Sequence, residues 1–138
     1  LEKMRFKDKI DYKFIIDPAL NKNNISMPVM LVQPFVENAI LHGILPKPEG
    51  GTIEIVAKKI SSRSYEILIK DDGVGFQKTN KVNALKKHNS VSINFAKERI
   101  KLLSKVSTGE FAFEILDRND IESTSGTIIK FILPIYYK

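Results

Sequence analysis

Two polar segments of this chain carry residue types that can bind a ligand. In the first, QPFVENAILHG at 33–43, Asn38 and His42 are four residues apart. Two side chains at that spacing project from the same side of a helix, one turn from each other. In the second, DDGVGF at 71–76, two glycines flank a single residue. Glycines so placed let the backbone pass close to a flat, rigid ligand.

The first segment lies in a stretch whose apolar residues have helical spacing. Leu31, Phe35 and Ala39 recur every four residues, as do Val36 and Ile40. This spacing predicts a helix with a broad buried stripe.

The predicted helix has a start signal and one interruption. Ser26 is a candidate N-cap, and Pro28 falls in the first turn, where its missing N–H costs little. Pro34 falls in the middle, where a proline removes a backbone hydrogen bond. We therefore expect a helix that is distorted near Pro34.

The rest of the chain predicts a sheet and a second long helix. Strands are expected at 12–16, 52–60, 65–70, 111–116 and 126–136, and a helix at 90–106. The strands 52–60 and 65–70 should pair as a hairpin that delivers Asp71 at its end. Segment 118–125 is predicted to be a polar turn. The pattern indicates an α+β fold, a two-layer sandwich in which about three helices cover one face of a mixed, mostly antiparallel sheet of about five strands.

Together, the two polar segments resemble the N box and first G box of the ATP-binding domain of sensor histidine kinases, within the superfamily shared by gyrase and MutL. The LytS-like kinases are more similar still, since their N box typically reads QP-hydrophobic-VENA-x-x-HG. The two boxes in this order are a specific signal, whereas either alone is weak. The resemblance covers nearly the whole chain and implies a Bergerat-type fold that binds ATP and Mg²⁺.

The resemblance implies catalytic roles at the N box. Asn38 matches the family's magnesium ligand, and its neutral carbonyl oxygen is a type that Mg²⁺ accepts; the alternative is a surface amide bonded to backbone. Glu37 could orient a water or polarise a nucleophile. ATP-hydrolysing relatives place their general base where this chain has Pro34, which argues against hydrolysis. His42 could contact phosphate or pack on the base, or it is an ordinary surface histidine. Many family members carry Lys where Leu41 stands here.

The first G box implies the residues that read the base. Asp71 matches the carboxylate that accepts a hydrogen bond from the adenine amino group and rejects guanine, while Gly73 and Gly75 let the backbone pass the base. The alternative is a tight Asp-Gly turn, which needs neither the second glycine nor Phe76. Thr127 matches the family's late G-T, whose hydroxyl usually reaches the adenine site; the alternative is an ordinary threonine at a strand start.

The second G box departs from the family pattern. The family reads G-x-G-L or S-x-G-L and then E-R-L, whereas 90–100 reads SVSINFAKERI, with Ser92 at the more constant glycine. Those backbone amides normally hold the β- and γ-phosphates at a helix N-terminus, and serine resists positive φ and adds bulk. Lys97 or Arg99 could supply charge to the phosphates, or could be solvated. The polar segment 77–89 is the candidate for a mobile lid over the nucleotide.

Bulk properties limit the classes of function. The 138 residues suit one domain, and the absence of cysteine excludes a disulfide framework and a cysteine-based zinc site. The net charge is +6, but the lysines are scattered, so a solvated surface is favoured over a nucleic-acid interface. A moderate positive potential also suits a triphosphate. No apolar run is long enough to cross a bilayer.

The domain expectation is a linker at 1–11 followed by a catalytic domain at 12–138. The start LEKMRF resembles the family segment that joins the phosphoacceptor helices to the ATP-binding domain. Since the chain begins at Leu1 rather than Met, we expect a fragment of a longer protein. Neither His42 nor His88 has the family's P-H-F-L-F-N context, so the phosphoacceptor histidine is expected outside it.

By resemblance, the chain transfers the γ-phosphate of ATP to a histidine on an upstream dimerisation domain and thence to a response regulator. The whole protein is then expected to be a homodimer on the cytoplasmic side of the inner membrane, with no nucleic-acid partner. Two alternatives stay open. One is a degenerate nucleotide-binding scaffold or sensor, suggested by Ser92 and Leu41. The other is an anti-sigma-type serine kinase on the same fold.

Overall fold

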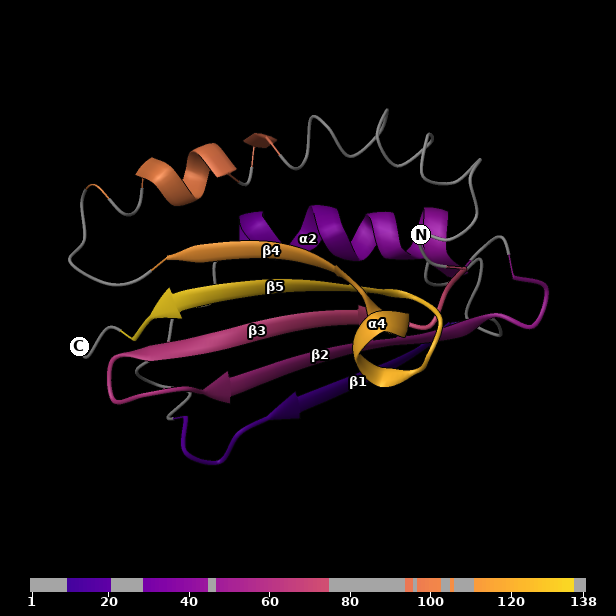
Figure 1. The fold of residues 1–138 in the computed structure, drawn as a ribbon, viewed down its shortest axis with the longest axis horizontal. Helices are drawn as coiled ribbons and strands as arrows, with labels where there is room; N and C mark the ends of the chain where they lie inside the picture. The colour runs from indigo at the N-terminus through magenta and orange to yellow at the C-terminus, as the bar shows by residue number, and fades with distance from the viewer. Residues whose placement is uncertain are drawn as a thin grey trace.

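A computed structural model of the chain describes residues 10–20, 29–44, 47–74, 94–95, 97–102, 105 and 111–135; for 29–31, 41 and 42 it describes the backbone alone. The expected lid at 77–89, the linker before residue 10, Ser26 and Pro28 lie outside these residues. Within the described part, a sheet forms one layer and the helical residues 29–44 form a second layer over one of its faces (Figure 1).

The described residues form five strands in one sheet. They are β1 (Ile10–Ile16), β2 (Gly51–Lys59), β3 (Ser64–Asp71), β4 (Ala112–Asp117) and β5 (Thr127–Pro134). The order across the sheet is β1-β2-β3-β5-β4, with β1 and β2 parallel and the other pairs antiparallel. The expected mixed, mostly antiparallel sheet is confirmed. The β2–β3 hairpin ends at Asp71, as the alternation of its residues predicts.

The N-box helix divides into two parts. The α-helix α2 (Val29–Asn38) continues directly into the π-helical segment η1 (Ala39–Ile44). Pro34 lies inside α2 without ending it, and the irregular turns come after it. A π-helix closes each turn with one more residue than an α-helix. Because η1 begins directly after Asn38, the turn between Asn38 and His42 is π-helical rather than the α-helical turn that the spacing predicted.

A short helix replaces the polar turn that we predicted at 118–125. This helix, α4 (Arg118–Glu122), joins β4 to β5. The Asp117 side chain caps it by accepting a hydrogen bond from the Asn119 amide at 3.0 Å, and Ser123 ends it in the left-handed conformation. An Asp N-cap satisfies an amide that has no partner within the helix. A single turn of helix has no hydrophobic period, so the pattern of the sequence could not predict it.

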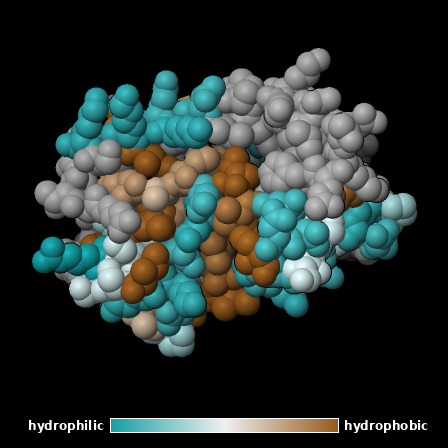
Figure 2. All heavy atoms as spheres, in the orientation of Figure 1, coloured by the Kyte–Doolittle hydropathy of each residue, from teal (hydrophilic) through white to brown (hydrophobic). Residues whose placement is uncertain are grey.

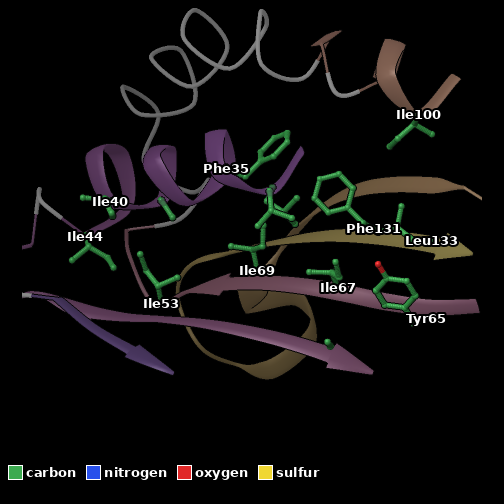
Figure 3. Close-up of a cluster of buried hydrophobic side chains, with 14 of the residues drawn as sticks. Phe35, Ile40, Ile44, Ile53, Tyr65, Ile67, Ile69, Ile100, Phe131 and Leu133 are labelled. Carbon is green, nitrogen blue, oxygen red and sulfur yellow. The ribbon is translucent and has the colours of Figure 1, made fainter. Parts of the chain in front are cut away.

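The core lies between the sheet and the helices. Tyr65, Ile67 and Ile69 alternate along β3 and are buried, as the period of a strand requires. Phe35 of α2 packs between Phe113 and Phe131, with ring centroids 5.3 and 5.7 Å away. Figure 3 shows Ile40 and Ile44 pointing from the helical segment onto the strands. The contacts of Phe35 hold α2 against the sheet.

The side of the molecule seen in Figure 2 has hydrophobic side chains between hydrophilic ones. The edge strand β1 exposes three consecutive large apolar side chains, those of Phe14, Ile15 and Ile16. No helix in the described part of the chain is long and apolar enough to span a bilayer.

Candidate functional site

Asp71 ends the central strand β3, and its side chain is buried. It pairs with Ile53 of β2, and its neighbour Lys70 pairs with Ile128 of β5. The continued antiparallel register places Asp71 opposite Thr127, the first residue of β5. Residues directly opposite in a sheet share a face, so Asp71 and Thr127 lie side by side on the face that the helices cover.

The Asp71 carboxylate faces η1. Its Oδ1 accepts a hydrogen bond from the Gly73 amide at 2.9 Å, and a β-carbon on Gly43 would lie only 3.0 Å from the same oxygen. A side chain at position 43 would thus push against the carboxylate. The last residue of the N box and the first residue of the G box are in contact.

Two further glycines complete this packing. A β-carbon on Gly73 would overlap the Gly43 backbone, and the Val74 amide donates to the Gly43 carbonyl at 3.1 Å. Gly126 has φ 137°, and a β-carbon there would overlap the Asp71 carbonyl oxygen. The sequence assigned Gly73 to a close approach of a ligand; the structure adds a close approach between two backbone segments.

Asp72 has a different role from Asp71, although the two are adjacent. Its Oδ1 accepts from the Thr52 amide at 2.7 Å, and its own amide donates to the Thr52 carbonyl at 3.3 Å. A β-carbon on Gly51 would overlap the same carboxylate oxygen. Asp72 therefore ties the segment to the start of β2, and Asp71 is the aspartate that faces the helices.

Three consecutive carbonyl oxygens, those of 71–73, each accept a hydrogen bond from a side chain. In chain order the donors are Arg118 Nη1 at 3.1 Å, Lys47 Nζ at 2.7 Å and Ser125 Oγ at 2.5 Å. The backbone of the G box is thus held from two segments, the loop at Lys47 and the β4–β5 connection that carries Arg118 and Ser125. None of these donors was predicted from the sequence, since each looks like a polar loop residue.

At the N box, Glu37 and Asn38 have different surroundings. Glu37 is exposed and accepts a hydrogen bond from Gln33 Nε2 at 3.2 Å. The Asn38 Nδ2 atom is buried and has no hydrogen-bond partner in the described structure. A buried amide without a partner is costly, which makes Asn38 an unusual residue to place at the end of α2.

Several known proteins that are similar to this chain are sensor histidine kinases. No family model matches the chain. The sensor histidine kinase YpdA of Escherichia coli K12 is 28% identical over 141 residues, which are 94% of this chain and 24% of YpdA. The uncharacterized protein YwpD of Bacillus subtilis 168 is 36% identical over 85 residues, 62% of this chain and 30% of YwpD. The sensor histidine kinase/phosphatase LytS of Staphylococcus aureus is 28% identical over 78 residues, 56% of this chain and 13% of LytS.

The homologues of this chain include sensor histidine kinases, LytS among them, which confirms the resemblance drawn from the N box and first G box. The chain spans less than a third of the length of each relative.

Solved histidine kinase structures share the fold. The mycobacterial sensor histidine kinase MprB has a TM-score of 0.64 at 16% identity, covering 99% of this chain and 89% of that one. The catalytic domain of histidine kinase ThkA has a TM-score of 0.58 at 16% identity, covering 99% and 86%. ThkA in complex with the response regulator protein TrrA has a TM-score of 0.57 at 16% identity, covering 97% and 36%. These likenesses confirm the predicted α/β sandwich.

The histidine kinase fold brings some of the expected site residues together and not others. Asp71 and Gly73 meet Gly43 of η1, which also contains the backbone of His42, and Gly126, the residue before Thr127, meets the Asp71 main chain. Arg99 is exposed, and its guanidinium lies 5.5 Å from the ring centroid of Phe95. The expected site residues outside the described part of the chain are Gly75, Phe76 and Ser92.

Ile100, the residue after Arg99, lies near Leu133 in Figure 3, at the other end of the view from Ile40 and Ile44.

Proposed function

We propose that this chain is the ATP-binding catalytic domain of a two-component sensor histidine kinase. The observation that carries the proposal is the meeting of three motifs around Asp71. Gly43 closes the N box, Gly73 belongs to the first G box, and Gly126 precedes the late Thr127; all three come within contact of Asp71 or of each other. These motifs are far apart in the sequence, so their convergence supports one shared nucleotide site.

In this proposal Asp71 selects the base. A buried carboxylate accepts a hydrogen bond from the amino group of adenine, whereas the carbonyl of guanine would leave two acceptors facing each other. Thr127, opposite Asp71, offers a hydroxyl from the same row of the sheet. Gly75 and Phe76 complete the base pocket on the basis of the sequence pattern.

Asn38 would hold Mg²⁺ beside the phosphates. An amide oxygen is a type that Mg²⁺ binds, and the buried Nδ2 atom, which has no partner in the described structure, is a donor that suits a phosphate oxygen beside the ion. When bound, the ion supplies charge neutralisation for phosphoryl transfer. His42, Ser92 and Arg99 are assigned to the phosphates by the sequence pattern alone.

The transfer step moves the γ-phosphoryl group to a histidine nitrogen and leaves ADP. That histidine would lie on an upstream dimerisation domain, and the phosphoryl group would pass on to a response regulator. Glu37 supports this role because its carboxylate is exposed, where an incoming imidazole can reach it. The solved complex of ThkA with TrrA supports a response regulator as partner. A homodimer at the cytoplasmic side of the inner membrane is part of the proposal for the whole protein.

Calorimetric titration of the 138-residue chain with ATP, with and without Mg²⁺, tests the nucleotide site. We expect binding that requires Mg²⁺ and is lost in Asp71→Asn. The matched control is Asp72→Asn, because an asparagine there keeps the oxygen that accepts from Thr52. Absence of binding in the wild-type chain would reject the proposal. Tight binding without transfer to histidine in the longer protein would favour the scaffold alternative.

A further inference from the structure

A ring of contacts surrounds the peptide that carries Asp71. Arg118 Nη1 donates to the Asp71 carbonyl at 3.1 Å, and Arg118 Nε lies 3.2 Å from Glu122 Oε1, one helical turn later. The other oxygen, Glu122 Oε2, accepts from Lys70 Nζ at 2.5 Å. Because Lys70 directly precedes Asp71, these contacts form a closed ring that starts and ends at the Lys70–Asp71 peptide.

This ring differs from an ordinary surface ion pair. The side chains of Arg118 and Lys70 are 14% and 16% exposed, although that of Glu122 is 30% exposed, so water screens the two cations only partly. Arg118 uses two donors of one planar guanidinium, one for the Asp71 carbonyl and one for Glu122. A planar fork that makes two directed bonds is held in a single orientation. The Lys70 ammonium, and then Arg118, also lower the pKa of the Glu122 carboxyl, which keeps it charged.

The ring lies on the side of the sheet away from the Asp71 carboxylate. Consecutive residues of a strand point to opposite faces, so Lys70 points away from the face on which Asp71 meets η1. Arg118 also anchors the β4–β5 corner, since its amide donates to the Gly126 carbonyl at 3.0 Å. Arg118 thus holds the main chain of Asp71 from the face of the sheet opposite its carboxylate.

We propose that Arg118, anchored by Glu122, is a positioning residue for the choice of nucleotide base. It fixes the orientation of the Asp71 peptide so that the carboxylate can accept a well-aligned hydrogen bond from the amino group of adenine. Hydrogen bonds weaken steeply with misalignment, so a peptide that can rotate would lose part of the discrimination. The inference rests on the proposed ATP site and adds a residue that affects base selection through Asp71, without contacting the base itself.

The test compares the affinities of the chain for ATP and for inosine triphosphate, which carries a carbonyl in place of the amino group. We expect Arg118→Met to weaken ATP binding about tenfold and inosine triphosphate binding less than about twofold. Arg118→Lys, which keeps the charge but not the fork, should give an intermediate loss for ATP. Lys130→Met is the matched control, since it breaks an ion pair with Glu66 at 3.6 Å on the same face and should change neither affinity.

A second comparison asks whether Arg118 acts through Asp71. In an Asp71→Asn background, where ATP binding is lost, Arg118→Met should cause no further change in the affinity for inosine triphosphate. Equal loss of both nucleotides, or a further loss in that background, would overturn the inference while the ATP site stands. If Arg118→Met fails to fold by circular dichroism, Glu122→Gln decides, and its expected result is a smaller loss confined to ATP. A wild-type chain that binds neither nucleotide would reject the proposed function itself.

Discussion

Gly43 and Asp71 touch across the boundary between the helical layer and the sheet, and a methyl group on Gly43 would lie 3.0 Å from Asp71 Oδ1. We predict that Gly43→Ala displaces this carboxylate and weakens ATP binding about tenfold, or about 1.4 kcal/mol. The free energy of unfolding should fall much less than in Gly73→Ala, where the added carbon meets backbone rather than a side chain. Calorimetry and urea denaturation measure the two effects. Unchanged ATP binding in Gly43→Ala would contradict the placement of the base.

Gly126 and Ser123 both lie on the α4–β5 connection, and substitutions at the two positions should change the stability in opposite directions. Gly126→Ala should destabilise the fold by about 2–4 kcal/mol, because φ is 137° and the new carbon would overlap the Asp71 carbonyl oxygen. Ser123→Gly should instead stabilise it by up to about 1 kcal/mol, since Ser123 already has positive φ, at 56°. Urea unfolding of both variants checks the signs. Two losses of equal size would show that the conformation of this turn is misassigned.

Two phenylalanines test where the core lies. Phe35 packs against Phe113 and Phe131, whereas Phe14 on the edge strand is 69% exposed. Phe35→Ala should lower the free energy of unfolding by about 3–5 kcal/mol, and Phe14→Ala by less than about 0.5 kcal/mol. Thermal and urea melts measure both. A large loss at Phe14 would mean that β1 is covered in solution.

Glu122 gives a prediction for pH. The hydrogen bond from Lys70 lowers the pKa of Glu122 in the folded chain below its ordinary value. A lowered pKa adds stability above the unfolded pKa, and this stability is lost as the pH falls through the folded pKa. Glu122→Gln should therefore be less stable than wild type near neutral pH, and the difference should shrink in acid. Urea midpoints across an acid-to-neutral series check this.

The control for this series is Glu66→Gln. Glu66 pairs with Lys130 at 3.6 Å, a longer contact than that between Glu122 and Lys70. Its loss of stability near neutral pH should be smaller. If Glu122→Gln and Glu66→Gln behave alike, the ring around Asp71 adds little to stability.

The alternation of apolar and polar residues, together with local turn signals, was enough to predict the sheet. The strand predicted at 65–70 is found at Ser64–Asp71, and the one predicted at 111–116 is found at Ala112–Asp117. Alternation predicts such strands because one face of each is buried. The family resemblance of the two motifs also indicated correctly that the N box and first G box lie together, since Gly43 and Asp71 are in contact.

Contacts between distant loop residues could not be predicted in the same way. Lys47, Arg118 and Ser125 hold the carbonyls of 71–73 from positions 25, 47 and 52 residues away along the chain. Alone in the sequence, such residues look like solvated polar positions, since neither period nor local turn chemistry shows their partners. The change to π-helix at Ala39 has no period signal either, and a proline disturbs the turn before it rather than the one after.

The central position of β3 has a consequence for how the chain opens. Strand β3 pairs on both sides and carries three of the largest fully buried side chains, those of Tyr65, Ile67 and Ile69. Strand β1 pairs only with β2 among the described strands. In native-state hydrogen exchange, β3 amides should exchange only by global unfolding, and β1 amides by a local opening of lower free energy. Asp71 is therefore attached to the slowest-exchanging strand, so base selection would survive fluctuations that release the sheet's edge.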